Sequence, residues 1–255
     1  MDKIRNVLGQ LGGISAIALD GMLSLRRRPL QLDEFRRQAW FITKVSAIPL
    51  VLISVPFGMI IALHVGSFFR QLGAEAQIGS ALFLATVREQ APIATALLIS
   101  GAGGSAMTAD IGSRRIRDEI DAMQVMGVNP VQRLVMPRVL AAVVLAVALD
   151  AVVSVAGIAG GWFFATRVDD VSSSAFFASF DELSQLADLW MALIKAACFG
   201  FIAGVVACWK GIHAKGGPKG VGDAVNQAVV ITFVLLFFVN FVLTVVYFNF
   251  VPQKV

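Results

Sequence analysis

Five long apolar runs constrain this chain more than any other feature of its sequence. They lie at about residues 45–65, 78–107, 134–164, 189–209 and 224–251. A helix needs about 20 residues to cross the hydrocarbon core of a bilayer, and each run meets that length. The 255-residue chain is 57% hydrophobic and only 15% charged, with a mean hydropathy of +0.78, which excludes an ordinary soluble domain. We therefore predict an all-α polytopic membrane protein with five transmembrane helices.

The first 44 residues are more polar and are expected to form interfacial and elbow helices. Residues 2–19 place apolar and polar side chains on opposite helix faces, which is typical of a helix that lies in the interface plane. Trp40 and Phe41 suit the headgroup level, so the stretch after Arg26–Arg28 should turn the chain into the bilayer. We thus divide the chain into an N-terminal part, 1–44, and a membrane domain, 45–255. Pro49 and Pro56 are expected to kink or break the first span.

The distribution of Lys and Arg predicts the orientation. With a cytoplasmic N-terminus, sixteen basic residues fall in inner segments and three, Arg70, Arg167 and Lys254, in outer ones. This bias favours a cytoplasmic N-terminus and an outer C-terminus. It also explains the net charge of +4 better than a nucleic-acid-binding face or a basic N-terminal arm, because the basic residues follow the loops. The outer loop after Phe164 is acidic, with Asp169, Asp170, Asp181, Glu182 and Asp188.

A densely charged segment, Asp110–Arg138, separates the second and third apolar runs. Ile116, Ile120 and Met123 recur at helical spacing and predict a helix with one narrow apolar stripe, which Gly127 ends. Opposite charges four residues apart can pair on neighbouring turns. The predicted pairs are Arg114–Asp118, Arg115–Glu119 and Arg117–Asp121. The segment is interpreted as a docking surface at the membrane edge; the alternative is a solvated helix whose arginines sit on lipid phosphates.

Arg138 is counted with the inner segments, which leaves two basic residues inside the apolar runs, Arg88 and Lys195, and with them come the acidic residues Glu89 and Asp150. A charge near the bilayer centre costs about 2.5 to 3.5 kcal/mol on insertion scales, so each should face protein or water. Arg88 and Glu89 are adjacent and cannot be satisfied by facing each other, so we expect one of them to reach Lys195. The alternative is a buried ion pair that only locks two helices, with Arg88 snorkelling outward. Nothing nearby in the sequence supports a role for Asp150.

Other chemistry has little support in the sequence. Cys198 and Cys208 are about 15 Å apart along a helix, too far for a disulfide, and we interpret them as small core residues. His64 and His213 are isolated, so no metal site is predicted. The GGPKG run at Gly216–Gly220 lacks the GK[ST] of a phosphate-binding loop, so a partner must handle any ATP. We predict neither an enzyme nor a catalytic residue in this chain. The pairs Gly157/Gly161 and Gly200/Gly204 favour tight helix packing.

Several motifs together resemble the MlaE/YrbE permease family. They are Arg88-Glu89-x-x-Pro92, SGAGGSAMTADIG (100–112), IRDEIDAMQVMG (116–127), NPVQRLVMPRVLA (129–141), LIK (193–195), KGGPKGVGDAVNQAVV (215–230) and NFVLT (240–244). The resemblance covers nearly the whole chain after about Arg27, which makes 45–255 an MlaE/YrbE-type permease domain. Its details are most similar to actinobacterial Mce-system permeases of the YrbE "A" subunit type.

This resemblance implies a multi-pass permease subunit of an ABC-type lipid transporter in the inner (plasma) membrane. In the family, a permease dimer, of identical or paralogous YrbE subunits, works with a separate cytoplasmic ATPase that uses ATP and Mg, and with MCE-domain proteins outside. The cargo would be fatty or mycolic acids or sterols, and the expected direction of transport is import. The chain itself needs no cofactor or metal.

The resemblance also assigns residues. The coupling helix to the ATPase would be Ser113–Met126, with Arg114, Arg115, Arg117, Asp118, Glu119, Asp121 and Met123. The intramembrane charges at the lipid cavity would be Arg88, Glu89, Lys195 and Asn240. Three departures from the family pattern, Ala102, Gln124 and Asn240, favour a specialised heterodimeric version. Two other functions stay open from the residues: a proton-coupled secondary transporter with Glu89 and Asp150 as its relay, and a structural membrane subunit.

Overall fold

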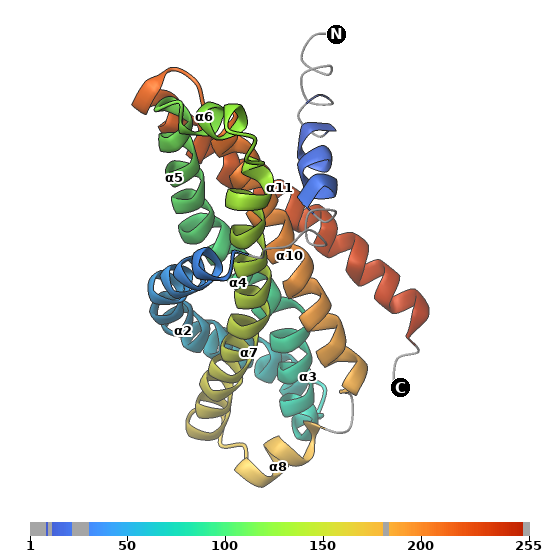
Figure 1. Cartoon of the computed structure of the whole chain (residues 1–255). Coiled ribbons are helices and arrows are strands. Elements are labelled where there is room, and N and C mark those ends of the chain that lie inside the picture. Colours follow the sequence, from blue (N-terminus) through green and yellow to red (C-terminus); the bar gives the residue numbers. More distant parts are fainter. Residues whose placement is uncertain (1–8, 10–11, 22–30, 181–183, 252–255) are drawn as a thin grey trace. The chain divides into compact units, whose positions relative to one another are not determined.

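The computed structural model describes residues 9, 12–21, 31–180 and 184–251. Every regular element in this part of the chain is helical (Figure 1). In chain order the elements are α2 (Leu32–Gln71), η1 (Glu75–Gln77), α3 (Ile78–Leu84), η2 (Ala85–Gln90), α4 (Ala91–Leu98), η3 (Ile99–Gly104), α5 (Ser105–Ile116), α6 (Glu119–Val125), η4 (Val131–Val135), α7 (Met136–Arg167), α8 (Ser173–Ala178), α10 (Leu186–Ile212) and α11 (Gly217–Phe250). Residues 12–21 are also helical. The rest of the predicted interfacial helix, the Arg26–Arg28 run, Asp181, Glu182 and Lys254 lie outside the described residues.

Five described stretches are long and apolar enough to cross a membrane. They are Leu32–Gln71, Ile78–Ile116, Val131–Arg167, Leu186–Ile212 and Gly217–Phe250. This confirms the prediction of an all-α polytopic membrane protein. Each stretch extends beyond the apolar run that predicted it, because a helix satisfies its backbone hydrogen bonds internally and can continue into more polar residues at the membrane edge.

The first span, α2, is one uninterrupted helix of 40 residues with Pro49 and Pro56 inside it. Of the two outcomes predicted for these prolines, a kink or a break, the break does not occur. A proline removes one backbone hydrogen bond and crowds the preceding turn, but the many remaining bonds of a helix this long keep it continuous. The division proposed at 44/45 falls inside α2.

The chain forms two compact units, each made of three segments. Unit 1 contains residues 1–45, 98–145 and 200–236; unit 2 contains 46–97, 146–199 and 237–255. The core of unit 1 gathers buried side chains from α5, α6, η4, α7 and α10, namely Ile111, Ile120, Leu134, Val135, Val139, Val205 and Cys208. Ile14, Ile17 and Ala18 of the helical residues 12–21 pack against it, so this amphipathic helix rests its apolar face on unit 1.

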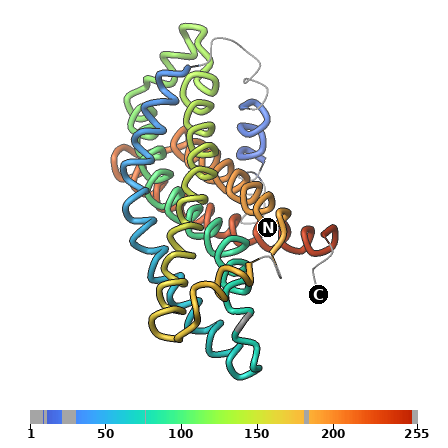
Figure 2. The backbone as a smooth tube through the Cα atoms, turned by 90° about the horizontal axis from the view of Figure 1, so that it is seen from below, coloured from blue at the N-terminus to red at the C-terminus, as the bar shows by residue number. Residues whose placement is uncertain are grey.

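Unit 2 is held together by small residues and aromatic rings. The short helix α8 lies against α3 (Figures 1 and 2), and its Phe176 is fully buried. A Cβ on Gly79 would lie 2.1 Å from the Phe176 carbonyl oxygen, so α3 can approach α8 this closely only at a glycine. Gly58 allows α2 to approach α7 in the same way, because a Cβ on Gly58 would lie 1.9 Å from the Gly157 carbonyl oxygen, and a Cβ on Gly157 would itself lie 2.8 Å from Thr86 Cγ2. The tight packing expected at Gly157 is thus present.

The charged segment of unit 1 is two helices where the sequence predicted one. α5 ends at Ile116 and α6 begins at Glu119, and Figure 1 shows α6 turning away from the axis of α5. Asp118, between them, has a left-handed backbone with φ 57°. Aspartate tolerates this conformation better than most residues because its short side chain can bond locally. The single helix predicted for Ser113–Met126 is therefore wrong.

Candidate functional site

Unit 2 brings together charged side chains from three spans. Arg88 and Glu89 lie in η2, a π-helical turn that interrupts the second span. Such turns are rare and frequently occur at functional sites, because the extra residue re-aims neighbouring side chains. Arg88 and Glu89 accordingly reach different partners, although they are adjacent in the chain. We call the group formed with α10 and α11 the intramembrane cluster: Arg88, Glu89, Asp188, Lys195, Asn240, Thr244 and Tyr247.

Glu89 is the centre of one half of the cluster. Lys195 of α10 donates from Nζ to Glu89 Oε1 at 2.8 Å, to the Arg88 carbonyl oxygen at 3.0 Å and to Thr244 Oγ1 at 2.8 Å. Asn240 of α11 donates from Nδ2 to Glu89 Oε2 at 3.0 Å. The ammonium is therefore fully buried with three acceptors, as a charge in an apolar span requires. The Glu89 side chain stays 36% exposed and is the most exposed of the four charged side chains in the cluster.

Arg88 is the centre of the other half. Its Nε and Nη2 donate to Asp188 Oδ1 at 3.0 and 2.5 Å, and the Tyr247 hydroxyl donates to the same oxygen at 2.5 Å. The guanidinium also lies over the rings of Tyr247 and Phe248, 5.0 and 5.2 Å from their centroids. Such ring contacts add to the charge pair when both are withdrawn from water. Arg88 thus points to Asp188 and does not snorkel outward as the alternative interpretation expected.

The cluster carries two cations and two anions, so the burial of each charge is offset by a partner. Removing a charge without its partner would leave an uncompensated ion in an apolar environment, which is far more costly than losing the pair. The arrangement therefore locks the second, fourth and fifth spans of unit 2 to one another. It also presents one partly exposed carboxylate, Glu89, beside amide and hydroxyl groups that can bind a polar ligand group.

Asp150 of α7 contrasts with these residues. It is 2% exposed, and its Oδ1 has no hydrogen-bond partner among the described residues. Glu89 bonds with Lys195, Thr244 and Asn240, and no described hydrogen bond joins it to Asp150. The two carboxylates of the proposed proton relay are thus not directly linked in this structure.

Unit 1 carries a second charged group, at the turn between α5 and α6. Its ion pairs join residues across the turn: Arg115 with Asp121, Arg117 with Glu119, and Arg114 with both Asp110 and Glu119. None of the three pairs predicted at a spacing of four residues forms, because the left-handed Asp118 ends the helical register on which they depended. The side chains concerned are 31% to 59% exposed, so the pairs stand in solvent.

The end of α6 confirms the helix stop predicted at Gly127 and differs from the prediction for Met123. Gly127 stops the helix with φ 76°, and the Val128 amide donates back to the Met123 carbonyl oxygen at 2.9 Å. Met123, expected on a docking surface, instead packs against the core of unit 1. The apolar side chains left exposed are Val125 and Met126, at 90% and 70%. The sequence pattern did not single them out, although they lie just outside the predicted stripe.

Arg138, counted in the sequence as a loop arginine, is fully buried in unit 1. Its Nη2 lies 2.5 Å from Asp110 Oδ2 and 2.8 Å from Glu34 Oε1, and its Nη1 donates to the Leu134 carbonyl oxygen at 2.7 Å. One guanidinium therefore links α2, α5 and the start of α7. A planar fork of donors suits such a three-way contact.

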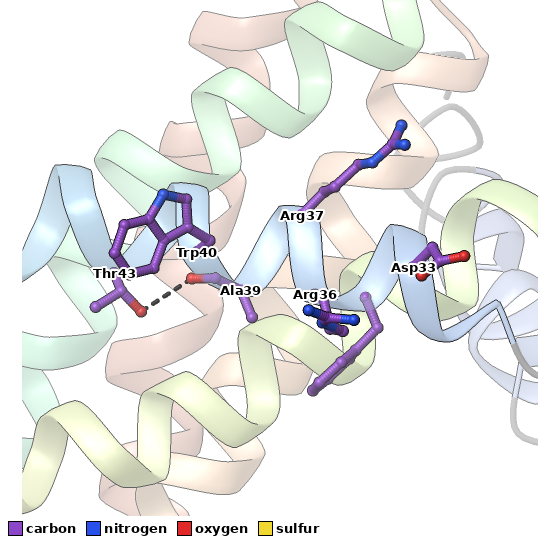
Figure 3. Close-up of a pocket in the computed structure, with 7 residues that line it drawn as sticks. Asp33, Arg36, Arg37, Ala39, Trp40 and Thr43 are labelled. Atoms are coloured by element: carbon purple, nitrogen blue, oxygen red, sulfur yellow. Dashed lines mark hydrogen bonds between the residues drawn. The ribbon is translucent and has the colours of Figure 1, made fainter.

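The start of α2 forms an open surface hollow of about 640 Å³. It is lined by one stretch of helix, namely Asp33, Phe35, Arg36, Arg37, Ala39, Trp40 and Thr43. Figure 3 shows Arg36 and Arg37 on different sides of the helix, so they do not converge on a common ligand. Trp40 is 72% exposed, which fits its predicted place at the headgroup level. We regard the hollow as membrane-facing surface.

Comparison with known proteins decides the family. The family model "Permease MlaE" matches residues 35–246 of this chain. The chain belongs to the MlaE permease family. A probable ABC transporter permease protein of Rickettsia felis is 30% identical over 94% of this chain and 92% of its own length. One from Synechocystis sp. is 34% identical over 78% and 76%. The protein TRIGALACTOSYLDIACYLGLYCEROL 1, chloroplastic, of Arabidopsis thaliana is 31% identical over 78% of this chain and 57% of its own length.

Membership of an ABC transporter permease family implies a partner ATPase and a permease dimer. For this MlaE-family permease, the structure brings together four of the residues selected from sequence, Arg88, Glu89, Lys195 and Asn240. The predicted link between Lys195 and its neighbours is present, with Glu89 as the carboxylate.

Sequence reasoning missed Asp188 and Tyr247 of this MlaE-family permease. It placed Asp188 in an outer acidic loop, whereas the residue is fully buried and pairs with Arg88. Helical spacing was the available signal. Asp188 and Lys195 are seven residues apart and share one face of α10, and Asn240, Thr244 and Tyr247 share one face of α11.

Proposed function

We propose that this chain is the membrane permease subunit of an ABC-type lipid transporter of the Mce kind. In this proposal the chain pairs with an identical or paralogous YrbE permease in the inner membrane. A cytoplasmic ATPase binds on one side and MCE-domain proteins on the other, and the complex imports hydrophobic lipids such as fatty or mycolic acids or sterols. The N-terminus would be cytoplasmic and the C-terminus outside, as the distribution of basic residues predicts.

The intramembrane cluster beside an apolar strip is the observation that carries the lipid assignment. Glu89 is partly exposed, and α11, which supplies its partners Asn240 and Thr244, also carries exposed rings at Phe241 (68%) and Phe248 (50%). A ligand with a polar head and a long apolar body matches a polar group next to an apolar helix face. The name of the Arabidopsis relative, which contains that of a galactolipid, agrees with a lipid cargo.

The charged turn between α5 and α6 supports the assignment of the ATPase contact. It presents solvated charges at Arg115, Arg117, Asp118, Glu119 and Asp121, next to the exposed Val125 and Met126. Protein interfaces commonly combine an apolar centre with a polar rim. We propose that Val125 and Met126 enter a hollow on the ATPase while the charges set the orientation.

Lipid movement by the reconstituted complex tests the proposal. The permease would be co-expressed with its ATPase, placed in liposomes, and supplied with a labelled fatty acid with and without ATP. We expect ATP-dependent transfer that Glu89→Gln reduces about tenfold, the effect of losing one charged hydrogen bond worth about 1.5 kcal/mol. Asn249→Ala, on the exposed end of α11, is the matched control and should transfer lipid normally.

Two results would reject the proposed function as an ABC-type lipid transporter. If ATP does not increase transfer, or if the purified permease never retains an ATPase, the ABC assignment fails. The unpartnered Asp150 favours one rival, a proton-coupled transporter. Transfer driven by a pH gradient in ATP-free liposomes, and abolished in Asp150→Asn, would replace our proposal with that one.

A further inference from the structure

A separate polar pocket lies in unit 1, where α10 ends and α11 begins. Its volume is about 420 Å³. The residues that line it are Trp209, Lys210, His213, Ala214, Lys215, Gly220, Asp223, Ala224 and Gln227. None of them belongs to the intramembrane cluster or to the turn between α5 and α6. The pocket is therefore distinct from both of those groups.

Lys210 supplies a fixed positive charge to this pocket. The residue is 6% exposed, its Nζ donates to Gln227 Oε1 at 2.9 Å, and the ammonium lies 5.0 Å from the centroid of the Trp209 ring. An amide oxygen and an indole ring hold a cation in place without adding a formal negative charge. Gln227 and Trp209 thus fix the position of the Lys210 ammonium at the pocket.

The loop after α10 brings a second lysine to the same pocket. A Cβ on Gly220 would lie 1.5 Å from the Lys215 carbonyl oxygen, so the loop can fold onto the first turn of α11 only because residue 220 is glycine. Gly216 and Gly217 complete the bend with φ of 84° and 72°. Two lysines and one histidine then face a single carboxylate, Asp223, so the lining carries a net positive charge.

The pocket lies at a membrane face. It joins the adjacent ends of two successive spans, Leu186–Ile212 and Gly217–Phe250, whichever orientation the protein takes. Trp209 is a residue type enriched at this level, and its ring packs on His213 with centroids 4.8 Å apart. A Cβ on Gly13 would lie 2.6 Å from Trp209 Nε1, so the amphipathic helix of residues 12–21 reaches the same level.

We propose that this pocket binds the phosphate group of an anionic phospholipid at the membrane face. Phosphate is a ligand that lysine ammonium groups bind well as point charges, and the headgroup of such a lipid lies at the depth of Trp209. The bound lipid would hold the α10–α11 loop against the helix ends. This inference concerns a resident lipid, and it does not depend on the cargo or on the direction of transport.

Lipid binding by the purified full-length permease tests the inference. The delipidated protein in detergent would be titrated with phosphatidylglycerol or phosphatidylcholine, and the bound lipid counted by native mass spectrometry. We expect a clear preference for phosphatidylglycerol, reduced about fivefold in Lys215→Gln, because one basic residue near the membrane contributes about 1 kcal/mol. Lys210→Gln should reduce it at least as much. Lys219→Gln removes the same charge from the first turn of α11, next to this loop but outside the pocket lining, and is the matched control.

Each outcome of these titrations either supports or overturns the proposed phospholipid site. Equal binding of the two lipids, or equal losses in Lys215→Gln and Lys219→Gln, would overturn the proposal. Lys210 is buried, so its variant is interpreted only if it keeps the native thermal transition; Lys215 is exposed and keeps the test valid if Lys210→Gln unfolds. A third titration, with inorganic phosphate, distinguishes a phospholipid headgroup from a soluble phosphate compound as the ligand. If free phosphate competes at millimolar concentration and phosphatidylglycerol shows no preference, the lipid assignment is overturned and a soluble phosphate compound takes its place.

Discussion

The intramembrane cluster and the turn between α5 and α6 contain the same kinds of side chain in opposite environments. In the cluster, Arg88 and Asp188 are almost withdrawn from solvent, and Asp188 accepts a further hydrogen bond from the Tyr247 hydroxyl. At the turn, Arg117 and Glu119 pair while 59% and 39% exposed. Buried pairs cannot exchange their partner for water, whereas exposed pairs can. The cluster is thus suited to hold spans together, and the turn is free to pair with another protein.

The largest effect should follow from breaking the buried pair. Asp188→Ala leaves the guanidinium of Arg88 buried without a carboxylate, and we expect a loss of about 3 to 5 kcal/mol in unfolding free energy. Reversible unfolding in bicelles measures it. The double variant Arg88→Met/Asp188→Leu removes both charges and should recover most of that loss. A single variant as stable as the wild type would show that burial does not distinguish the cluster from the turn.

Arg138 tests whether burial, rather than membership of unit 1 or unit 2, decides how much unfolding free energy is lost when a charged residue is replaced. It belongs to unit 1 with the turn but is fully buried, while Glu34 and Asp110 are 23% and 37% exposed. Water can reach these carboxylates when the arginine is lost, so Arg138→Gln should cost about 2 to 3 kcal/mol, less than Asp188→Ala. The same unfolding measurement applies. Arg133→Gln, close by in the chain, serves as the control, and equal effects for the two arginines would contradict this reasoning.

The backbone at Asp118 should give a smaller effect. A non-glycine residue in the left-handed region costs about 1 kcal/mol, which glycine avoids. We therefore expect Asp118→Gly to leave stability unchanged or slightly higher, and Asp118→Ala to lower it by about 1 kcal/mol. If the two variants have equal stability, the backbone at this position is not left-handed. ATPase retention by Asp118→Gly separately reports the contribution of the carboxylate to docking.

The smallest change in stability should come from the exposed pairs. Arg115→Gln and Asp121→Asn break a solvated ion pair and should shift the unfolding free energy by less than about 1 kcal/mol. The same variants should weaken ATPase binding, which is measured by co-purification and by lipid-stimulated ATP hydrolysis. Lys44→Gln, a basic residue of α2 outside the turn, is the matched control. Large destabilisation with unchanged ATPase binding would reverse the contrast between the two regions.

Part of the site was predictable because an apolar span offers few partners for a charge. One of Arg88 and Glu89 was expected to reach Lys195 for that reason, and Glu89 does. Asp188 was misplaced because it follows an acidic loop, and linear composition cannot show which end of such a stretch enters the helix. The ion pairs predicted within residues 114–121 do not form, because the left-handed backbone of Asp118 ends the helix and changes the direction of the side chains that follow.

The sequence by itself determined the five membrane helices, the family, the stop at Gly127 and the need for charges inside the spans to find partners. These follow from local physics: the length of an apolar run, the freedom of a glycine and the cost of an unpaired charge. Tertiary structure alone decided that Arg88 pairs with Asp188 and Tyr247, that Arg138 is buried, and that Lys210 and Lys215 share a pocket. Those contacts join residues from separate helices, and they depend on how the faces of those helices meet.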